Sequence, residues 1–104
     1  MRDFTFAETR SDGSAKLALS GDLDMSATFR LEPALDRLLS SGQVDELVLD
    51  LSGLAFVDSS GLGLLLATSE RSRDAGIAMA IVEPSPEIQR VFRLAGVDGV
   101  LPLR

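Results

Sequence analysis

Two stretches near the start of the chain alternate apolar and polar residues, the pattern of strands with one buried face. They span residues 3–10 and 14–20. The segment between them, Ser11-Asp12-Gly13-Ser14, has the composition of a tight turn. The pattern therefore predicts an antiparallel hairpin near one edge of a sheet. The next segment, Gly21-Asp22-Leu23-Asp24, is predicted to be a polar turn that leads into Ser26.

Apolar residues recur at helical spacing from Ser26 onward, and Gly42 stands where that helix would end. Pro33 falls inside the segment and would remove one backbone hydrogen bond. The first turns are therefore expected to be kinked, or the helix to begin nearer Leu31. One helix over roughly 26–41 is the prediction.

Two short apolar runs are predicted strands, and a helix is predicted between them. Residues 47–51 are rich in leucine and valine and are too short for a helix. Residues 77–82 are apolar throughout, which is typical of a strand covered on both faces of a sheet. The helix between the two runs would end before Gly76. Its shared face would carry Leu62, Leu65, Leu66 and Ser69.

Ser85-Pro86-Glu87 marks the start of a third helix, with a capping serine, a first-position proline and an acid in the first turn. Gly96 would end it, and Val100-Leu101 is predicted to add a short final strand. The predicted order is β-β-α-β-α-β-α-(β), an α/β fold with a small mixed sheet packed against helices. At 104 residues, the chain is expected to form one domain over residues 1–104.

The amino-acid composition limits the kinds of chemistry and the classes of partner that are expected of this chain. The net charge is −6, and Lys16 is the only lysine among ten basic residues, so no nucleic-acid partner is expected. The lack of histidine and cysteine excludes Ser-His-Asp catalysis, a histidine phosphorelay, disulfides and the usual zinc sites. Neither a membrane-spanning run nor a signal peptide is evident, and the cytoplasm is the expected location. No enzyme activity and no cofactor are expected.

The segment Asp58-Ser59-Ser60-Gly61-Leu62-Gly63 joins a predicted strand to the second predicted helix. Aspartate and serine suit a helix N-terminus, where unpaired N–H groups and the helix dipole favour oxygen ligands, including a phosphate. The simplest interpretation is a helix cap. Three enzyme motifs fail on spacing: Leu66 replaces the third glycine of a dinucleotide loop, no Walker lysine follows, and neither serine has the glycine of a nucleophile elbow. An aspartate-phosphorylated receiver centred on Asp50 would need further acids and a late lysine.

Four features follow one another along the chain: Gly21-Asp22-Leu23-Asp24, a helix, the run 47–51 and the segment 57–63. Taken in this order, they resemble the STAS domain family. More narrowly, they resemble the anti-sigma factor antagonists of bacterial partner-switching systems. The resemblance covers essentially the whole chain, although the family often carries Glu where this chain has Asp22. It implies a single STAS-type domain.

The resemblance also implies a switch. In that family, a serine at the start of the second helix is phosphorylated by an anti-sigma factor that is a serine kinase with a histidine-kinase-like ATPase fold. The unphosphorylated form binds this factor and releases the sigma factor. Carried over, Ser60 is the phosphoacceptor and Ser59 the alternative, with a serine phosphatase as a further partner. The implied surroundings of the site and contacts to the partner are Asp22, Asp24, Asp58, Gly61 and Leu62.

A phosphate there would add about −1.5 to −2 charge beside Asp58, and a helix N-terminus can hold it without unfolding. Loss of binding with an intact fold is therefore expected. Gly61, which has no Cβ, is expected to let a partner approach closely. The alternative function is a stand-alone STAS subunit that acts as a docking component of a transporter or a stress-signalling complex.

Overall fold

The computed structural model describes residues 2–104. Its elements are β1 (Thr5–Ser11), β2 (Ser14–Leu23), α1 (Met25–Ser40), β3 (Glu46–Val57), α2 (Ser59–Asp74), β4 (Ala78–Val82) and α3 (Pro86–Leu94). The strands form one sheet in the order β1-β2-β3-β4, in which β1 is antiparallel to β2 and the other pairs are parallel. The predicted mixed α/β architecture is confirmed.

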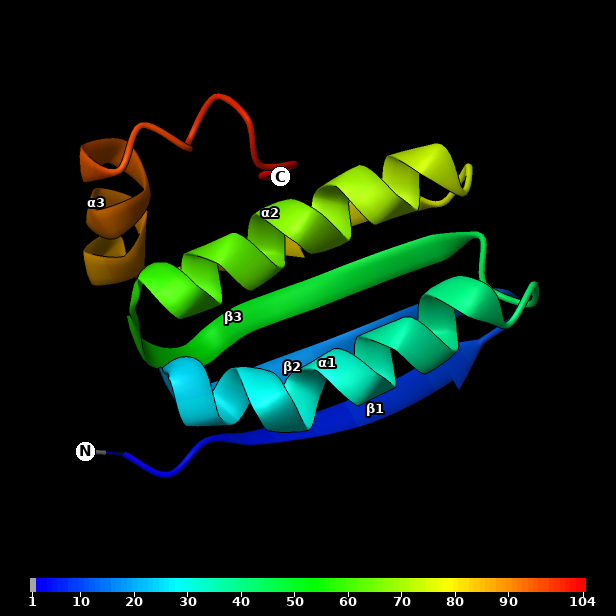
Figure 1. Cartoon of the computed structure of the whole chain (residues 1–104), viewed down its shortest axis with the longest axis horizontal. Coiled ribbons are helices and arrows are strands. Elements are labelled where there is room, and N and C mark those ends of the chain that lie inside the picture. Colours follow the sequence, from blue (N-terminus) through cyan, green and yellow to red (C-terminus); the bar gives the residue numbers. More distant parts are fainter. Residues whose placement is uncertain (1) are drawn as a thin grey trace.

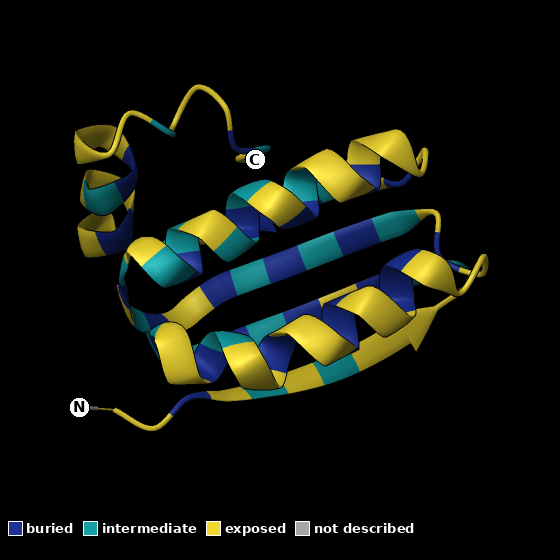
Figure 2. Ribbon diagram, viewed as in Figure 1, coloured by how far each residue is buried: buried dark blue, intermediate teal, exposed yellow. Residues whose placement is uncertain are grey.

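One face of the sheet carries the core. Burial alternates along β2 and along the first half of β3. The inward side chains are leucines with at most 1% exposure, which are Leu17, Leu19, Leu47, Leu49 and Leu51. α1 and α2 lie over this face, side by side (Figure 1), and turn their buried residues toward it (Figure 2). Each leucine that leaves water here contributes about 1.5–3 kcal/mol to folding.

The other face of the sheet is more open, and the prediction that residues 77–82 are covered on both sides holds only for the middle of this run. In β4, Ile81 is fully buried on the core side, and on the other side Ala80 is buried, whereas Ala78 is exposed and Val82 is half-buried. Lys16 and Asp50 also lie on this open face, where their side chains form an ion pair of 3.7 Å. The sequence of residues 77–82 resembles a strand buried on both faces because its outward-facing residues are small and apolar.

Both central strands are longer than predicted. The expected turn over residues 21–24 is wrong, because β2 continues to Leu23. β3 likewise passes through Ser52-Gly53 to Val57. The ladder between β2 and β3 shifts register twice, between Ala18 and Ser20 and between Gly21 and Asp22. Pairing with a neighbouring strand thus keeps these polar and glycine-containing segments extended.

Two further predictions concern α1 and the C-terminal tail. α1 is a single helix that begins at Met25 and passes through the exposed Pro33, so it does not start near Leu31. The predicted strand at Val100-Leu101 is wrong, because the Val100 and Leu101 N–H groups both donate to Val97 in a turn. The tail pairs two residues later, where Leu103 forms an isolated parallel bridge with Ile81.

Candidate functional site at the paired helix starts

α1 and α2 run in the same direction and begin at the same end of the sheet (Figure 1). Each follows a strand that ends on a buried residue, Leu23 in β2 and Val57 in β3, and these two residues are partners in the parallel ladder. The Asp58 N–H donates to the Leu23 carbonyl at 3.2 Å, which ties the two helix starts together. Two positive helix ends therefore meet at one edge of the molecule.

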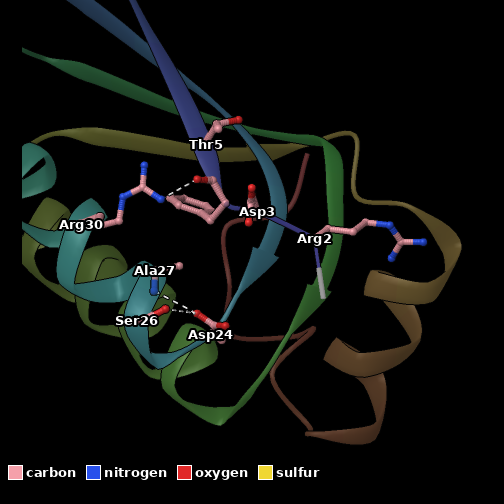
Figure 3. Close-up of a pocket in the computed structure, with 8 residues that line it drawn as sticks. Arg2, Asp3, Thr5, Asp24, Ser26, Ala27 and Arg30 are labelled. Atoms are coloured by element: carbon pink, nitrogen blue, oxygen red, sulfur yellow. Dashed lines mark hydrogen bonds between the residues drawn. The ribbon is translucent and has the colours of Figure 1, made fainter.

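Each helix start is capped by an aspartate. The Asp24 carboxylate accepts hydrogen bonds from the Ala27 N–H at 2.9 Å and from the Ser26 hydroxyl at 3.0 Å (Figure 3). These bonds, first the one from Ala27 and then the one from Ser26, hold the pKa of Asp24 below its ordinary value of 3.8. Asp58 accepts from the Gly61 N–H at 2.9 Å. Both acids are thus N-caps, a role that residue type alone favoured.

Ser59 and Ser60 are the first two residues of α2. Ser59 is exposed and Ser60 is half-buried. Their backbone N–H groups belong to the first turn, where a helix has no carbonyl to accept them. An anion on either hydroxyl would therefore lie close to free N–H donors and to the positive end of the helix dipole.

Gly61 is buried, and its lack of a side chain serves packing inside the protein. A Cβ at this position would lie 2.5 Å from the Leu23 carbonyl oxygen and 2.8 Å from the Val57 Cγ2 atom. The close approach of α2 to the end of β2 accounts for this glycine without an external partner, in contrast to the access role expected from the sequence. Leu62, the next residue, is half-buried and packs against the core.

Asp22 does not join the two capping acids. It lies between Gly21 and Leu23, which are both buried, so its side chain faces the open side of the sheet, where it pairs with Phe56. The Arg2 N–H donates to its Oδ2 atom at 3.0 Å. Its Oδ1 atom is buried and has no hydrogen-bond partner within residues 2–104. Asp22 therefore anchors the N-terminal segment, and the sheet separates it from the helix layer.

A shallow pocket lies next to the start of α1 (Figure 3). Its lining residues are Arg2, Asp3, Phe4, Thr5, Asp24, Ser26, Ala27 and Arg30. The Arg30 guanidinium donates to the Phe4 carbonyl at 2.6 Å and lies 5.7 Å from the centre of the Phe4 ring. Arg2 extends in the opposite direction (Figure 3), so the two arginines do not converge on one anion.

The sequence reasoning missed two exposed apolar residues at the start of α1. Met25 is 59% exposed and Phe29 is 71% exposed. The buried stripe of α1 runs through Ala27, Leu31 and Ala34, so Phe29 falls on the face that an amphipathic helix normally gives to polar residues. That departure from the helical pattern was the available signal.

Comparison with known proteins identifies the family. Residues 6–103 match the family model described as "Mlab, STAS domain". This chain belongs to the STAS domain family. The match spans nearly all of the chain, and the predicted family is confirmed.

Within the family, this STAS domain groups with anti-sigma factor antagonists. It is 31% identical over 85 residues to the anti-sigma F factor antagonist of Paenibacillus polymyxa, which covers 82% of this chain and 73% of that protein. It is also similar to the structure of an anti-sigma factor antagonist from Mycobacterium paratuberculosis. The two structures superpose with a TM-score of 0.85 and 31% sequence identity, and the match covers 97% of this chain and 85% of the other.

The fold of this STAS domain is also that of SpoIIAA from Bacillus, whose structure is known in two states. The unphosphorylated form matches with a TM-score of 0.80 and 22% identity, covering 98% of this chain and 86% of that one. The phosphorylated form matches with a TM-score of 0.76 and 22% identity, covering 98% and 89%.

Two observations concern the described residues as a whole. None of the helices within residues 2–104 has both the length and the apolar character needed to cross a bilayer. In the same part of the chain, the acidic side chains form no cluster of three or more that could hold a metal ion.

Proposed function

We propose that this STAS protein is an anti-sigma factor antagonist that binds an anti-sigma factor, releases the sigma factor, and is switched off by phosphorylation at the start of α2. The observation that carries the proposal is the pair of serines at a helix start, next to the Asp58 cap, in a chain related to anti-sigma factor antagonists. The anti-sigma factor would be a serine kinase with a histidine-kinase-like ATPase fold. The interaction would take place in the cytoplasm.

The chemistry requires only an accessible hydroxyl from this chain. The kinase would transfer the γ-phosphoryl group of ATP to a serine oxygen, with loss of the hydroxyl proton and departure of ADP. The kinase would supply the nucleotide, the metal ion and the catalytic groups. This chain would act as substrate and ligand, and a serine phosphatase would restore the hydroxyl.

The two serines differ in accessibility. The sequence resemblance favours Ser60, and this stays a prediction. Ser59 is exposed whereas Ser60 is half-buried, so a kinase would reach the Ser59 hydroxyl with less movement of α2. Exposure thus supports the alternative acceptor, Ser59.

Phosphorylation would change the surface more than the fold. The phosphate adds about −1.5 to −2 charge and three acceptor oxygens. It would lie close to the carboxylates of Asp24 and Asp58, in a protein whose net charge is already −6. The free N–H groups of the first turn can hold the phosphate, while its charge and hydration oppose a partner surface that fitted the neutral hydroxyl.

The test is intact-mass spectrometry after incubation with ATP, Mg²⁺ and each purified histidine-kinase-like anti-sigma factor of the source organism. Wild-type protein should gain one phosphate with one of these kinases, and either Ser59→Ala or Ser60→Ala should abolish the gain. The double variant is the negative control. A wild-type protein that gains no phosphate with any of them, or an equal gain in both single variants, would sink the proposal.

A second candidate function is that of a docking subunit in a transporter or stress-signalling complex. It is kept because the matching family model is described by the name Mlab and not as an antagonist. Affinity purification of the tagged protein separates the two: a transporter ATPase among the stoichiometric partners supports the second function, and a kinase supports the first.

A further inference from the structure

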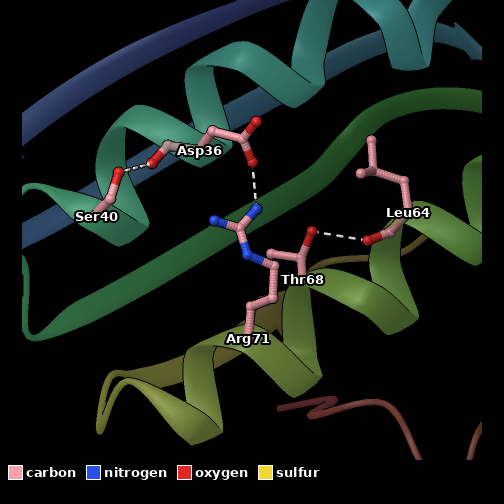
Figure 4. A network of polar contacts seen from close by, with 5 residues as sticks. All are labelled: Asp36, Ser40, Leu64, Thr68 and Arg71. Atoms are coloured by element: carbon pink, nitrogen blue, oxygen red, sulfur yellow. Dashed lines mark hydrogen bonds and ion pairs between the residues drawn. The ribbon is translucent and has the colours of Figure 1, made fainter.

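An ion pair joins α1 and α2 on their outer sides and shows which of their residues lie opposite each other. The Arg71 guanidinium of α2 pairs with the Asp36 carboxylate of α1, and the two residues are 35 positions apart (Figure 4). Because the helices run in the same direction, residues with the same separation are expected to face each other about two and three turns nearer the helix starts. This relation places Phe29 opposite Leu64 and Met25 opposite Ser60.

In Figure 4 the side chains of Leu64 and Arg71 both extend from α2 on the side of α1. Phe29 is 71% exposed, Met25 is 59% exposed and Leu64 is half-buried. We call Met25, Phe29 and Leu64 the α1–α2 patch. By this register the patch lies on the outer side of the two helices near their starts, close to the serines of α2.

Leu64 packs partly against the core, but the two α1 members of the patch, Met25 and Phe29, contribute little to the folding of this domain. Phe29 is absent from the buried residues of α1 and from the side chains that pack against the core. Large apolar side chains that gather on one surface, and especially an exposed phenylalanine, are characteristic of protein interfaces. Such a residue typically fills a pocket of the partner and contributes a large part of the binding energy.

Acidic side chains border the patch. Asp24 and Asp58 cap the two helices, and Glu32 follows Phe29 on the same side of α1 and is exposed. A second copy of this chain would bring two acidic borders together, which is unfavourable for a protein of net charge −6. A complementary surface has an apolar centre flanked by arginine or lysine.

We propose that the α1–α2 patch is the docking surface for the anti-sigma factor, which meets it with an apolar cluster flanked by basic side chains. This rests on the proposed function and adds the part of the surface that supplies affinity. Phe29 and Met25 anchor the partner, while the serines next to them carry the switch. A phosphate at the start of α2 brings charge and bound water to the edge of an apolar contact, which explains why one modification displaces the whole partner.

The test is calorimetric titration of the unphosphorylated protein with the kinase that phosphorylates it. Phe29→Ala is expected to weaken binding by at least about 10-fold, and Met25→Ala with Phe29→Ala by more. Val100→Ala is the matched control, because Val100 is 61% exposed but lies next to Ser69 and Arg73 near the far end of α2. It should bind within about 2-fold of wild type, as substitutions outside an interface do.

Phosphorylation kinetics provide a second measurement. Phe29→Ala should raise the KM for this protein as a kinase substrate and leave kcat near the wild-type value, since the serines are untouched. Glu32→Lys should slow association at low salt, with the difference shrinking at high salt, because it replaces an attractive charge at the border.

The outcomes separate the two proposals. In one outcome, the kinase phosphorylates and binds the wild-type protein while Phe29→Ala and the double variant bind equally well. That result overturns the docking proposal and leaves the proposed function standing. If no kinase phosphorylates or binds the wild-type protein, both proposals are overturned. A wild-type homodimer that Phe29→Ala dissociates, measured by light scattering, assigns the patch to a second copy and also overturns the docking proposal.

Discussion

Gly61 and Gly63 lie two residues apart in α2 and have opposite surroundings. A Cβ on Gly61 would collide with the Leu23 carbonyl and the Val57 side chain, whereas a Cβ on Gly63 would meet no atom within 4 Å. The first glycine lets the start of α2 press against the end of β2. The second only lowers the helical propensity of α2.

This contrast gives a matched pair of variants. Gly61→Ala should lower the free energy of unfolding by about 2 kcal/mol or more, because the clash involves backbone and α2 must shift. Gly63→Ala should raise it by up to about 1 kcal/mol. Urea unfolding followed by far-UV circular dichroism measures both. A similar change in both variants would contradict the packing assigned to Gly61.

The stability of the folded protein depends on the protonation state of Asp24. Its pKa is lowered in the folded state, so its contribution to stability is present above the ordinary value of 3.8 and is lost as the pH falls through the lower folded value. Asp24→Ala should therefore be less stable than wild type at neutral pH, and the difference should shrink in acid below pH 3.8.

The comparison must be made between variants. Asp50, whose pKa is also lowered, first by the Ser52 N–H, contributes to the acid sensitivity of the whole protein. Asp24→Asn is the control, because the amide keeps an acceptor for the Ala27 N–H and does not titrate. Unfolding curves at several pH values measure the difference, and a constant gap between wild type and Asp24→Ala would contradict the prediction.

At the scale of elements, α1 is a helix that keeps an unfavourable residue. Pro33 lies in its interior and has no N–H to donate to the carbonyl of Phe29, four residues earlier. Packing of the buried face of α1 against the sheet holds the helix together in spite of this loss, since its inward residues from Ala27 to Leu39 are buried.

Pro33→Ala should therefore stabilise the protein. We expect the free energy of unfolding to rise by about 1–3 kcal/mol. The variant gains a helix hydrogen bond, but alanine also gives the unfolded chain more conformational freedom, which reduces the gain in stability. Pro33 is exposed, so no core contact is lost. Thermal or urea unfolding measures the change, and a less stable variant would show that α1 requires the proline.

At the scale of the whole molecule, one layer of helices covers one face of the sheet, and both helix starts open at the same end. A charge added at this end lies on the surface and at positive helix termini, so the domain can carry it without rearranging its core. The proposed switch is thus a change of surface on a constant fold.

Ser59→Asp and Ser60→Asp test this idea directly. At the true acceptor position, the aspartate should weaken binding to the anti-sigma factor, while Tm stays within a few degrees of wild type because acids are favourable in the first turn of a helix. Calorimetry and thermal unfolding are measured on the same samples. Unchanged affinity in both variants would count against a charge mechanism, and a collapse of Tm would indicate unfolding.

The sequence by itself determined the features that depend on neighbouring residues. The period of apolar positions placed the helices and the first hairpin, and the composition of residues 58–61 predicted the cap at the start of α2. Motif order also identified the family. These signals are local, because a hydrogen-bonded turn, a cap or an amphipathic face involves residues within one or two turns of each other.

The tertiary structure decided the features that join distant segments. Pairing between β2 and β3 extends both strands and turns Asp22 to the open face, away from Asp24. The approach of α2 to Leu23 explains Gly61, and the packing of α1 beside α2 brings Arg71 to Asp36. No local pattern specifies these contacts, because each arises only when elements separated by tens of residues pack on the same sheet.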